Sequence, residues 1–201
     1  MQVWAIVVAA GSGDRFGGPK QYEPLAGRRV LDHAVDACRT ACDGVVLVVP
    51  PDRAADPEPG ADTAVAGGAT RADSVRAGLA ALPDDVDVIV VHDAARPRAS
   101  AALFEAVIAA VQRGADGAVP ALPVADTVKR VAGDRVVETL DRTTLVAVQT
   151  PQAFRAEALR KAHADNADAT DDAALVEQAG GTVVIVPGES GNRKITHRGD
   201  L

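Results

Sequence analysis

Aromatic residues and positive charge are both scarce in this chain of 201 residues. Aromatics make up 2% of it, and 21 basic against 28 acidic residues give a net charge of −7 and an isoelectric point near 5.0. Proteins that bind single-stranded nucleic acid stack its bases on aromatic side chains, and binders of nucleic-acid polymers or anionic membranes carry clustered positive charge. The composition therefore argues against nucleic acid and membranes as partners.

Cysteines and long apolar runs are also few. The two cysteines, Cys38 and Cys42, have no neighbouring Cys/His cluster with zinc spacing, and a small secreted scaffold would carry more of them. No apolar run approaches the roughly 18 residues of a membrane helix. Met1–Val8 lacks the basic region of a signal peptide and reads as a strand. We expect small buried thiols in a cytoplasmic protein.

What the chain does contain is a regular alternation of strand and helix patterns. Apolar runs predict buried strands at Val3–Ala9, Val45–Val49 and Val86–Val91. Helical periodicity predicts helices at Val30–Cys42, Ala72–Leu82 and Ala101–Arg113, and Asp52–Asp62 is expected to be a loop or weak helix. This order predicts an α/β fold with a Rossmann-like, mainly parallel twisted sheet that carries helices on both faces.

The pattern changes in the second half of the chain. Asp126–Val131 and Arg135–Leu140 are rich in Val and Thr and flank an Ala-Gly-Asp turn, which predicts a β-hairpin. Beyond it we expect a buried strand at Leu145–Gln149, helices at Ala153–His163 and Asp171–Gln178, and a last strand at Thr182–Val186. We expect one domain over residues 1–201. A hairpin is too small to fold alone, so residues at about 124–143 are expected to form an arm that contacts a second copy of the chain.

A glycine-rich loop with two cations follows the first strand. Gly11, Gly13 and Gly17 let backbone N–H groups approach phosphate oxygens, and Arg15 and Lys20 supply positive charge. The glycines are spaced one residue too far apart for a dinucleotide fingerprint, and no Gly-Lys-Ser/Thr of a Walker loop occurs. A plain strand-to-helix turn is the alternative, but the paired cations favour phosphate binding.

The third strand ends in His92 and Asp93. Ligands of open α/β sheets bind beyond the carboxyl ends of the strands, where this segment and the glycine-rich loop meet. One carboxylate suits Mg²⁺, which binds through one or two carboxylates plus substrate phosphates, although Asp93 could instead be a capping residue. No partner for a catalytic triad lies near His92, so we expect it to be structural.

Two further segments are ambiguous by themselves. Gly67–Ser74 precedes a helix and either contacts a base or ribose or is an ordinary capped helix start. Gly191–Thr196 places cations after the last strand and by itself would be a solvated tail.

Taken together, the segments carry a resemblance that spans nearly the whole chain. In chain order they are Ala9-Ala10-Gly11-x-Gly13-x-Arg15, Pro19-Lys20-Gln21-Tyr22, Arg71-Ala72-Asp73-Ser74-Val75, Val91-His92-Asp93-Ala94-Ala95-Arg96-Pro97, Asp126-Thr127-Val128-Lys129-Arg130, Asp141-Arg142, Gln149-Thr150-Pro151-Gln152, Thr170-Asp171-Asp172 and Asn192-x-Lys194-Ile195-Thr196. With these motifs the chain resembles the 2-C-methyl-D-erythritol 4-phosphate cytidylyltransferases of the non-mevalonate isoprenoid pathway. The resemblance implies the nucleotidyltransferase variant of the Rossmann-like fold.

The resemblance also implies a reaction and a set of roles. CTP and methylerythritol phosphate would give the CDP-linked alcohol and pyrophosphate. The implied catalytic residues are Arg15, Lys20, Arg142 and Lys194, and Asp93 is the implied Mg²⁺ ligand. The implied nucleotide-binding residues are Ala9, Ala10, Gly11, Gly13, Gly68, Arg71, Ser74 and Ala94. The implied residues of the methylerythritol phosphate site are Arg96, Thr127, Thr150 and Thr170. A homodimer is implied, in which Arg142 reaches the partner's site.

The sequence departs from the family pattern in a few places and leaves rival functions open. Ala69 stands where the family usually has an acidic residue, the loop between Arg15 and Lys20 is a little short, and the sequence stops at Leu201, before the final helix of many members. One rival is a cytidylyltransferase for another polyol phosphate, such as ribitol 5-phosphate. A second is a non-catalytic nucleotide-binding protein, against which the presence of Arg15, Lys20, Asp93 and Lys194 argues.

Overall fold

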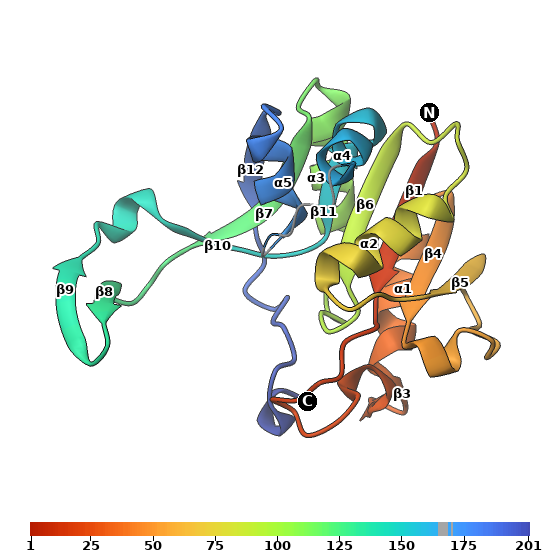
Figure 1. Ribbon diagram of the computed structural model, residues 1–201, viewed down its shortest axis with the longest axis horizontal. Helices are drawn as coiled ribbons and strands as arrows, with labels where there is room; N and C mark the ends of the chain where they lie inside the picture. Colours follow the sequence, from red (N-terminus) through yellow and green to blue (C-terminus); the bar gives the residue numbers. More distant parts are fainter. Residues whose placement is uncertain (165–168, 170) are drawn as a thin grey trace.

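An eight-stranded, mainly parallel sheet runs through the computed structural model, which describes residues 1–164, 169 and 171–201 (Figure 1). The strands of this sheet are β1 (Val3–Val8), β4 (Gly44–Val49), β5 (Thr63–Ala66), β6 (Val88–Asp93), β7 (Gly117–Pro123), β10 (Val146–Val148), β11 (Gln152–Arg155) and β12 (Val183–Pro187). The helices are α1 (Val30–Arg39), α2 (Arg71–Ala80), α3 (Ala101–Gln112), α4 (Ala156–His163) and α5 (Asp172–Gln178). The expected α/β class is confirmed.

The strands lie in the order β10-β7-β11-β6-β1-β4-β5, and β12 pairs with β7. The pairs β1–β4, β1–β6, β4–β5 and β7–β12 are parallel, whereas β10 and β11 run antiparallel to their neighbours. In β1, Ala5 and Val7 belong to the buried cluster on one face and Ile6 to that on the other. A strand covered on both faces needs apolar residues at every position, which is why the run is continuous.

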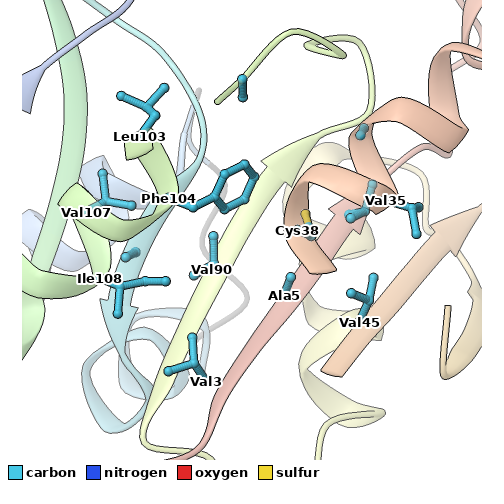
Figure 2. Close-up of a cluster of buried hydrophobic side chains, with 14 of the residues drawn as sticks. Val3, Ala5, Val35, Cys38, Val45, Val90, Leu103, Phe104, Val107 and Ile108 are labelled. Carbon is cyan, nitrogen blue, oxygen red and sulfur yellow. The ribbon is translucent and has the colours of Figure 1, made fainter. Parts of the chain in front are cut away.

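Helices cover both faces of the sheet, as the alternating pattern predicts. α1 and α3 pack on one face, where Figure 2 shows Cys38 of α1 and Phe104 of α3 over the strands that carry Ala5 and Val90. α2, α4 and α5 pack on the other face. α2 comes very close to β1 because Gly78 has no side chain: a Cβ there would lie 2.6 Å from Cγ2 of Ile6. Of the two thiols expected to be buried, that of Cys38 is fully buried, whereas Cys42 is only partly buried.

Some strands differ from their expected positions. The first residues of the predicted helix Ala153–His163 belong to β11, because their backbone pairs with β6 and β7. β5 and β7 are not predicted at all; β5 is a short strand at the sheet edge, and glycine and prolines obscure the pattern of β7. The prediction of a buried strand at Leu145–Gln149 is wrong about burial, since the three residues of β10 are exposed.

The predicted hairpin projects from the body of the molecule (Figure 1). β8 (Lys129–Ala132) and β9 (Arg135–Thr139) form a separate two-stranded sheet. Every residue of β8 and β9 is exposed, including Val131, Val136 and Val137, each more than half exposed. The arm thus presents apolar side chains to the outside of this chain. A second short hairpin, β2 (Pro24–Leu25) and β3 (Arg28–Arg29), precedes α1.

Within the described part of the chain, every helix is too short or too polar to cross a membrane.

Candidate active site

A cavity of about 570 Å³ opens at the carboxyl ends of β1 and β6, bounded on another side by the start of α2. It is lined by Val8, Ala9, Ala10, Gly11, Ser12, Gly13, Asp14, Arg15, Lys20, Gln21, Gly68, Ala69, Thr70, Arg71, Ser74, Asp93, Ala94, Ala95 and Lys194. Every residue predicted to bind the nucleotide is in this set, as are Arg15, Lys20, Asp93 and Lys194. Ligands of open α/β folds bind at this same place, beyond the carboxyl ends of the strands.

The glycine-rich loop is held in a tight turn. The N–H groups of Phe16 and Gly18 donate to the carbonyl oxygen of Gly13, at 2.8 and 3.2 Å. Gly13 has a φ of +73°, and a Cβ on it would lie 1.9 Å from the carbonyl oxygen of Gly18, so no other residue fits this turn. Phe16 anchors the turn, because its side chain is buried against Val30 and Ile195.

Gln21, which follows the same loop in the chain, fixes its start. Its buried amide nitrogen donates to the carbonyl oxygens of Ala9, at 2.8 Å, and Gly11, at 3.2 Å. The sequence motif contains Gln21, but its role could not be predicted because the hydrogen bonds depend on how the chain folds back. The preceding residue, Lys20, also lines the cavity.

The cavity concentrates positive charge. Burial, the neighbouring Lys194 and the neighbouring Arg15 all lower the pKa of Lys20, in that order of size, and Asp93 opposes them. An anion placed among these cations would favour the charged form of Lys20. The cavity is therefore built for a polyanion, in a protein whose net charge is negative.

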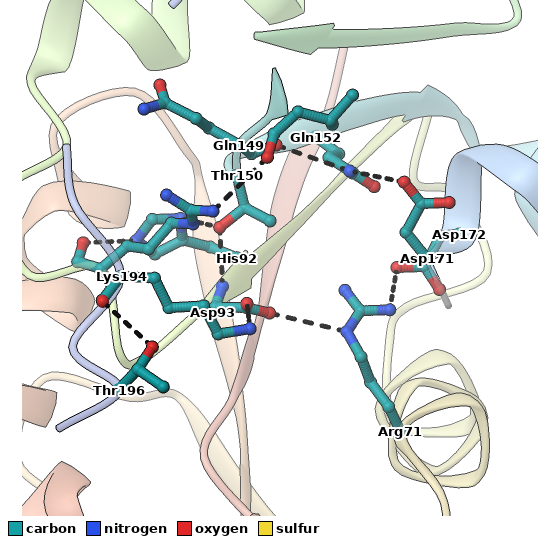
Figure 3. Close-up of polar contacts among 12 residues, drawn as sticks. Arg71, His92, Asp93, Gln149, Thr150, Gln152, Asp171, Asp172, Lys194 and Thr196 are labelled. Atoms are coloured by element: carbon teal, nitrogen blue, oxygen red, sulfur yellow. Dashed lines mark hydrogen bonds and ion pairs between the residues drawn. The ribbon is translucent and has the colours of Figure 1, made fainter. Parts of the chain in front are cut away.

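Asp93 lies between two cations. Its Oδ2 is 2.6 Å from Nζ of Lys194, and its Oδ1 is 3.5 Å from Nε of Arg71 (Figure 3). Burial alone would raise the pKa of this carboxyl group, but Lys194 and Arg71 hold it well below its usual range. Asp93 is therefore ionised at neutral pH.

One ionised carboxylate beside a cavity lined by cations is a donor set that Mg²⁺ accepts when substrate phosphates complete its shell. The described residues contain no group of three or more His, Cys, Asp or Glu side chains that could hold a metal ion. Asp93 fits the predicted ligand role.

Thr150 lies behind the cavity rather than on its wall. Its buried hydroxyl accepts from the backbone N–H of Asp93, at 3.0 Å, and contacts Nδ1 of His92, at 3.1 Å. The other ring nitrogen of His92 donates to the carbonyl oxygen of Arg96, at 3.2 Å. Burial lowers the pKa of His92 to about 4, so its ring is neutral and, as expected, has a structural place.

Arg96 and its neighbours hold the segment that carries Lys194. Nη1 of Arg96 donates to the carbonyl oxygen of Asn192, at 2.8 Å. The buried amide of Asn192 donates to the carbonyl oxygen of Thr150, at 2.9 Å, and Gln149 donates to that of Glu189, also at 2.9 Å. Gln149 and Asn192 occur in the sequence motifs, but only tertiary structure reveals that they anchor this segment.

The remaining predicted site residues do not line the cavity. Thr127 and Arg142 belong to the arm and are exposed; Nη1 of Arg142 donates to the carbonyl oxygen of Ala125. Within one chain the arm projects from the body of the molecule (Figure 1), and none of its residues lines the cavity. Thr170 lies outside the described residues.

The start of α2 forms the opposite wall. Oγ of Ser74 accepts from the N–H of Gly68, at 3.2 Å, and donates to the carbonyl oxygen of Thr70, at 3.0 Å. Thr70 and Asp73 cap the helix reciprocally. Ser74 thus holds Gly68 close to the helix. The segment Gly67–Ser74 is a capped helix start, and residues of the same segment line the cavity.

Known proteins resemble this chain along its whole length. The family described as "IspD: 2-C-methyl-D-erythritol 4-phosphate cytidylyltransferase" matches residues 3–201. A 2-C-methyl-D-erythritol 4-phosphate cytidylyltransferase of Frankia casuarinae is 46% identical over 100% of this chain and 79% of its own length. A "Bifunctional enzyme IspD/IspF" of Granulibacter bethesdensis is 45% identical over 100% of this chain and 55% of its own length.

Solved structures agree with these relatives. The crystal structure of 2-C-methyl-D-erythritol 4-phosphate cytidylyltransferase from Thermus thermophilus superposes with a TM-score of 0.85 at 37% identity, over 100% of this chain and 95% of that one. The bifunctional IspDF of Campylobacter jejuni gives a TM-score of 0.87 at 29% identity, with 53% of its length covered. The chain thus spans about half the length of the bifunctional relatives that it matches.

Proposed function

The chain belongs to the family of 2-C-methyl-D-erythritol 4-phosphate cytidylyltransferases, and on this premise we propose that it transfers CMP from CTP to methylerythritol phosphate. The products are 4-diphosphocytidyl-2-C-methyl-D-erythritol and pyrophosphate, a step of isoprenoid precursor synthesis. The observation that carries the proposal is the convergence of Arg15, Lys20 and Lys194 around one cavity with the ionised Asp93.

The proposed reaction needs charge neutralisation and alignment. The phosphate monoester of the acceptor is largely dianionic at neutral pH, because its second pKa is about 6. Its oxygen forms a bond to the α-phosphorus of CTP while the bond to the bridging oxygen of the β-phosphate breaks, and pyrophosphate leaves with that electron pair. No general base is required. Arg15 and Lys20 stabilise the negative charge that builds on the α-phosphate and the departing pyrophosphate.

Asp93 is the residue that would hold Mg²⁺, together with phosphate oxygens of CTP. When bound, the ion would neutralise part of the triphosphate charge and orient it. Asp93 is ready for this because Lys194 and Arg71 keep it ionised. Lys194 reaches the cavity from the C-terminal segment. It binds the acceptor phosphate, while the triphosphate neutralises part of its positive charge.

The nucleotide side is formed largely by backbone. The segment Ala10–Gly13 offers backbone N–H groups to the phosphates, and Gly68, Arg71 and Ser74 face the base and ribose. The N–H groups of Ala9 and Ala94 already donate to the carbonyl oxygens of Val48, at 2.8 Å, and Val8, at 3.1 Å, so these two residues contribute only to the cavity wall. Arg96 and Thr150 support the acceptor side through the hydrogen bonds that hold the Asp93 backbone and the Asn192 loop. Thr170 remains a predicted contact of the acceptor.

A second copy of the chain supplies the rest of the proposed site. We assign residues 1–201 to one nucleotidyltransferase domain and residues at about 124–143 to a dimerisation arm. The arm's exposed valines favour such a contact. Arg142 and Thr127 then act in the partner's cavity. The free cysteines are compatible with the reducing cytoplasm, where we place this chemistry.

The decisive experiment follows pyrophosphate release from CTP and Mg²⁺ with each of two acceptors, methylerythritol phosphate and ribitol 5-phosphate. We expect release with the former to have the higher kcat/KM. A preference for ribitol 5-phosphate would overturn the acceptor but not the reaction class. CTP binding without release from either acceptor would favour a non-catalytic nucleotide-binding protein.

A further inference from the structure

Arg71, at the start of α2, is bracketed by two carboxylates. Its Nη1 lies 2.7 Å from Oδ2 of Asp172, and its Nε lies 3.5 Å from Oδ1 of Asp93 (Figure 3). Asp172 is the first residue of α5, 101 positions further along the chain. The pair thus joins the helix on the nucleotide side of the cavity to a helix that does not line it.

Both carboxylate oxygens of the buried Asp172 accept hydrogen bonds. It is 1% exposed, and its other oxygen, Oδ1, accepts from Nε2 of His163, at 3.0 Å. Nδ1 of His163 is buried without a partner among the described residues, so the ring is best satisfied as the tautomer that carries its hydrogen on Nε2. Each carboxylate oxygen therefore has its own donor, and the direction in which Oδ2 points is fixed.

The helix that carries Asp172 is held as well. Oδ1 of Asp171 accepts from the backbone N–H of Ala174, at 3.0 Å, and caps α5. Its Oδ2 lies 3.4 Å from Nε2 of the buried Gln152, on β11. Asp172 is thus fixed both through the backbone of α5 and through its own two oxygens.

The two distances show which carboxylate holds Arg71. A contact of 2.7 Å is a short charge-assisted hydrogen bond, whereas 3.5 Å is beyond normal hydrogen-bond length. Without Asp172, the nearest anion for the guanidinium would be Asp93, and a planar guanidinium pairs readily with both oxygens of a carboxylate. Such a pair would occupy Oδ1 of Asp93, the oxygen that Lys194 does not take.

We propose that Asp172 is a positioning residue that draws Arg71 away from Asp93 and thereby keeps Oδ1 of Asp93 open to the cavity. His163 orients the Asp172 carboxylate through its hydrogen bond to Oδ1. The consequence for nucleotide binding rests on the proposed function, since it assumes that CTP occupies the cavity. The placement of Arg71 itself does not depend on that assumption.

The first test needs no substrate. The Nε–Hε signal of Arg71 in ¹⁵N NMR, assigned with Arg71→Lys, reports the hydrogen bonding of this guanidinium. In Asp172→Asn we expect the signal to shift as Arg71 turns to Asp93, and in the double variant Asp172→Asn/Asp93→Asn we expect it to approach the position of exposed arginines. An Arg71 signal that is unchanged in Asp172→Asn would overturn the proposal.

The second test separates positioning from stability. Asp172→Asn is expected to raise the Kd and KM for CTP about tenfold, the effect of losing one charge-assisted hydrogen bond, and to change kcat by less than about threefold. The matched control is Glu58→Gln, because Glu58 has a buried side chain, 2.8 Å from Nη2 of Arg29, and does not line the cavity. Glu58→Gln should lower thermal stability without changing the Kd or KM for CTP. A loss of stability in Asp172→Asn with normal CTP binding would leave Asp172 only structural and refute the proposal.

Three further variants keep the test sound if Asp172→Asn folds poorly. Asp172→Glu retains the charge and should recover most of the CTP affinity. His163→Leu removes the Nε2 donor and should weaken CTP binding a few-fold, whereas His163→Gln keeps a donor at that position and should not. Equal affinities in these two His163 variants would refute the orienting role.

A double-mutant cycle tests whether Asp172 acts through Arg71. In an Arg71→Lys background the Asp172→Asn change should have little further effect on CTP binding, because Asp172 acts through Arg71. Additive losses would contradict the proposal. If the wild-type protein binds CTP but releases no pyrophosphate, the proposed function fails, whereas the Arg71 signal and the CTP affinities still decide the role of Asp172.

Discussion

Nζ of Lys194 lies 2.6 Å from Oδ2 of Asp93, although 101 residues separate them in the chain. The contact joins the end of β6 to the C-terminal segment and places a cation and an ionised carboxylate at one cavity. The segment is held there by the backbone N–H of Ile195, which donates to the carbonyl oxygen of Ala95 at 2.8 Å. Binding of a polyanion must therefore compete with a contact that is already made.

Replacement of Asp93 by Asn should weaken folding in a pH-dependent way. The pKa of Asp93 is held below its ordinary value of 3.8, so its ion pairs contribute stability above that pH and lose it as the pH falls further. We expect Asp93→Asn to lower the free energy of unfolding by about 2 kcal/mol at pH 7. The gap between variant and wild type should narrow at pH 3. Urea titrations of both proteins at the two pH values measure it, and a gap independent of pH would contradict the ion-pair account.

Lys20 should be needed for turnover rather than for folding. It lines the cavity, where burial and the neighbouring cations Lys194 and Arg15 lower its pKa. We expect Lys20→Ala to reduce kcat by on the order of 10² or more, as for the removal of one preorganised electrostatic donor. The measurement is pyrophosphate release at saturating CTP.

The matched control for Lys20 is Lys161→Ala. Lys161 is an exposed lysine on α4 that does not line the cavity, and its removal should leave kcat unchanged. Undiminished pyrophosphate release in Lys20→Ala would overturn the proposed mechanism.

His92 should affect stability and not chemistry. Its neutral ring links Thr150 to the carbonyl oxygen of Arg96, and burial lowers its pKa to about 4. We expect His92→Phe to cost about 1–3 kcal/mol of unfolding free energy at pH 7, because two buried hydrogen bonds are lost. The folded variant should keep its kcat within a few-fold. A hundredfold loss of kcat in a folded variant would instead indicate a chemical role.

The pH dependence of stability provides a second test of His92. Since the unfolded chain takes up a proton near pH 6.5 and the folded chain only near pH 4, stability is lost as the pH falls through this window. The loss amounts to at most about 1.4 kcal/mol per pH unit. It should be present in the wild type and missing in His92→Phe.

The sequence could reveal those parts of the site that are local in the chain. Residue types within short segments are enough to predict the turn at Gly13, the cations Arg15 and Lys20, and the carboxylate Asp93 at a strand end. The contacts of Asp93 with Lys194 and of Arg71 with Asp172 join residues 101 positions apart. No local pattern contains such a pairing, so the motif that includes Asp172 does not reveal what its carboxylate contacts.

The errors in the fold have a similar physical origin. Ala153–His163 is rich in good helix formers, but the edges of β6 and β7 offer backbone hydrogen bonds that hold its first residues as β11. Leu145–Gln149 has the composition of a buried strand, yet β10 is exposed in the single chain. Its Val146 and Val148, which follow the arm in the chain, are 44% and 38% exposed.

The exposed valines of the arm predict a homodimer formed through the arm. Val131 and Val136 are paired across the hairpin and are 57% and 53% exposed, which is unfavourable unless a partner covers them. We expect Val136→Glu to shift the protein to monomers in analytical ultracentrifugation and to reduce activity, because Arg142 then loses its place. Ile185→Glu is the control, since Ile185 is equally apolar and exposed but lies on β12, away from the arm.

Mixed dimers test whether sites are shared. Lys20→Ala and Arg142→Ala should each be inactive alone. In a heterodimer of the two, one cavity has lost both residues, and the other pairs an intact Lys20 with an intact Arg142 from the partner. Random exchange of protomers should therefore restore about one quarter of wild-type activity. If Arg142 served the cavity of its own chain, every cavity would lack one of the two residues, and the mixture would stay inactive.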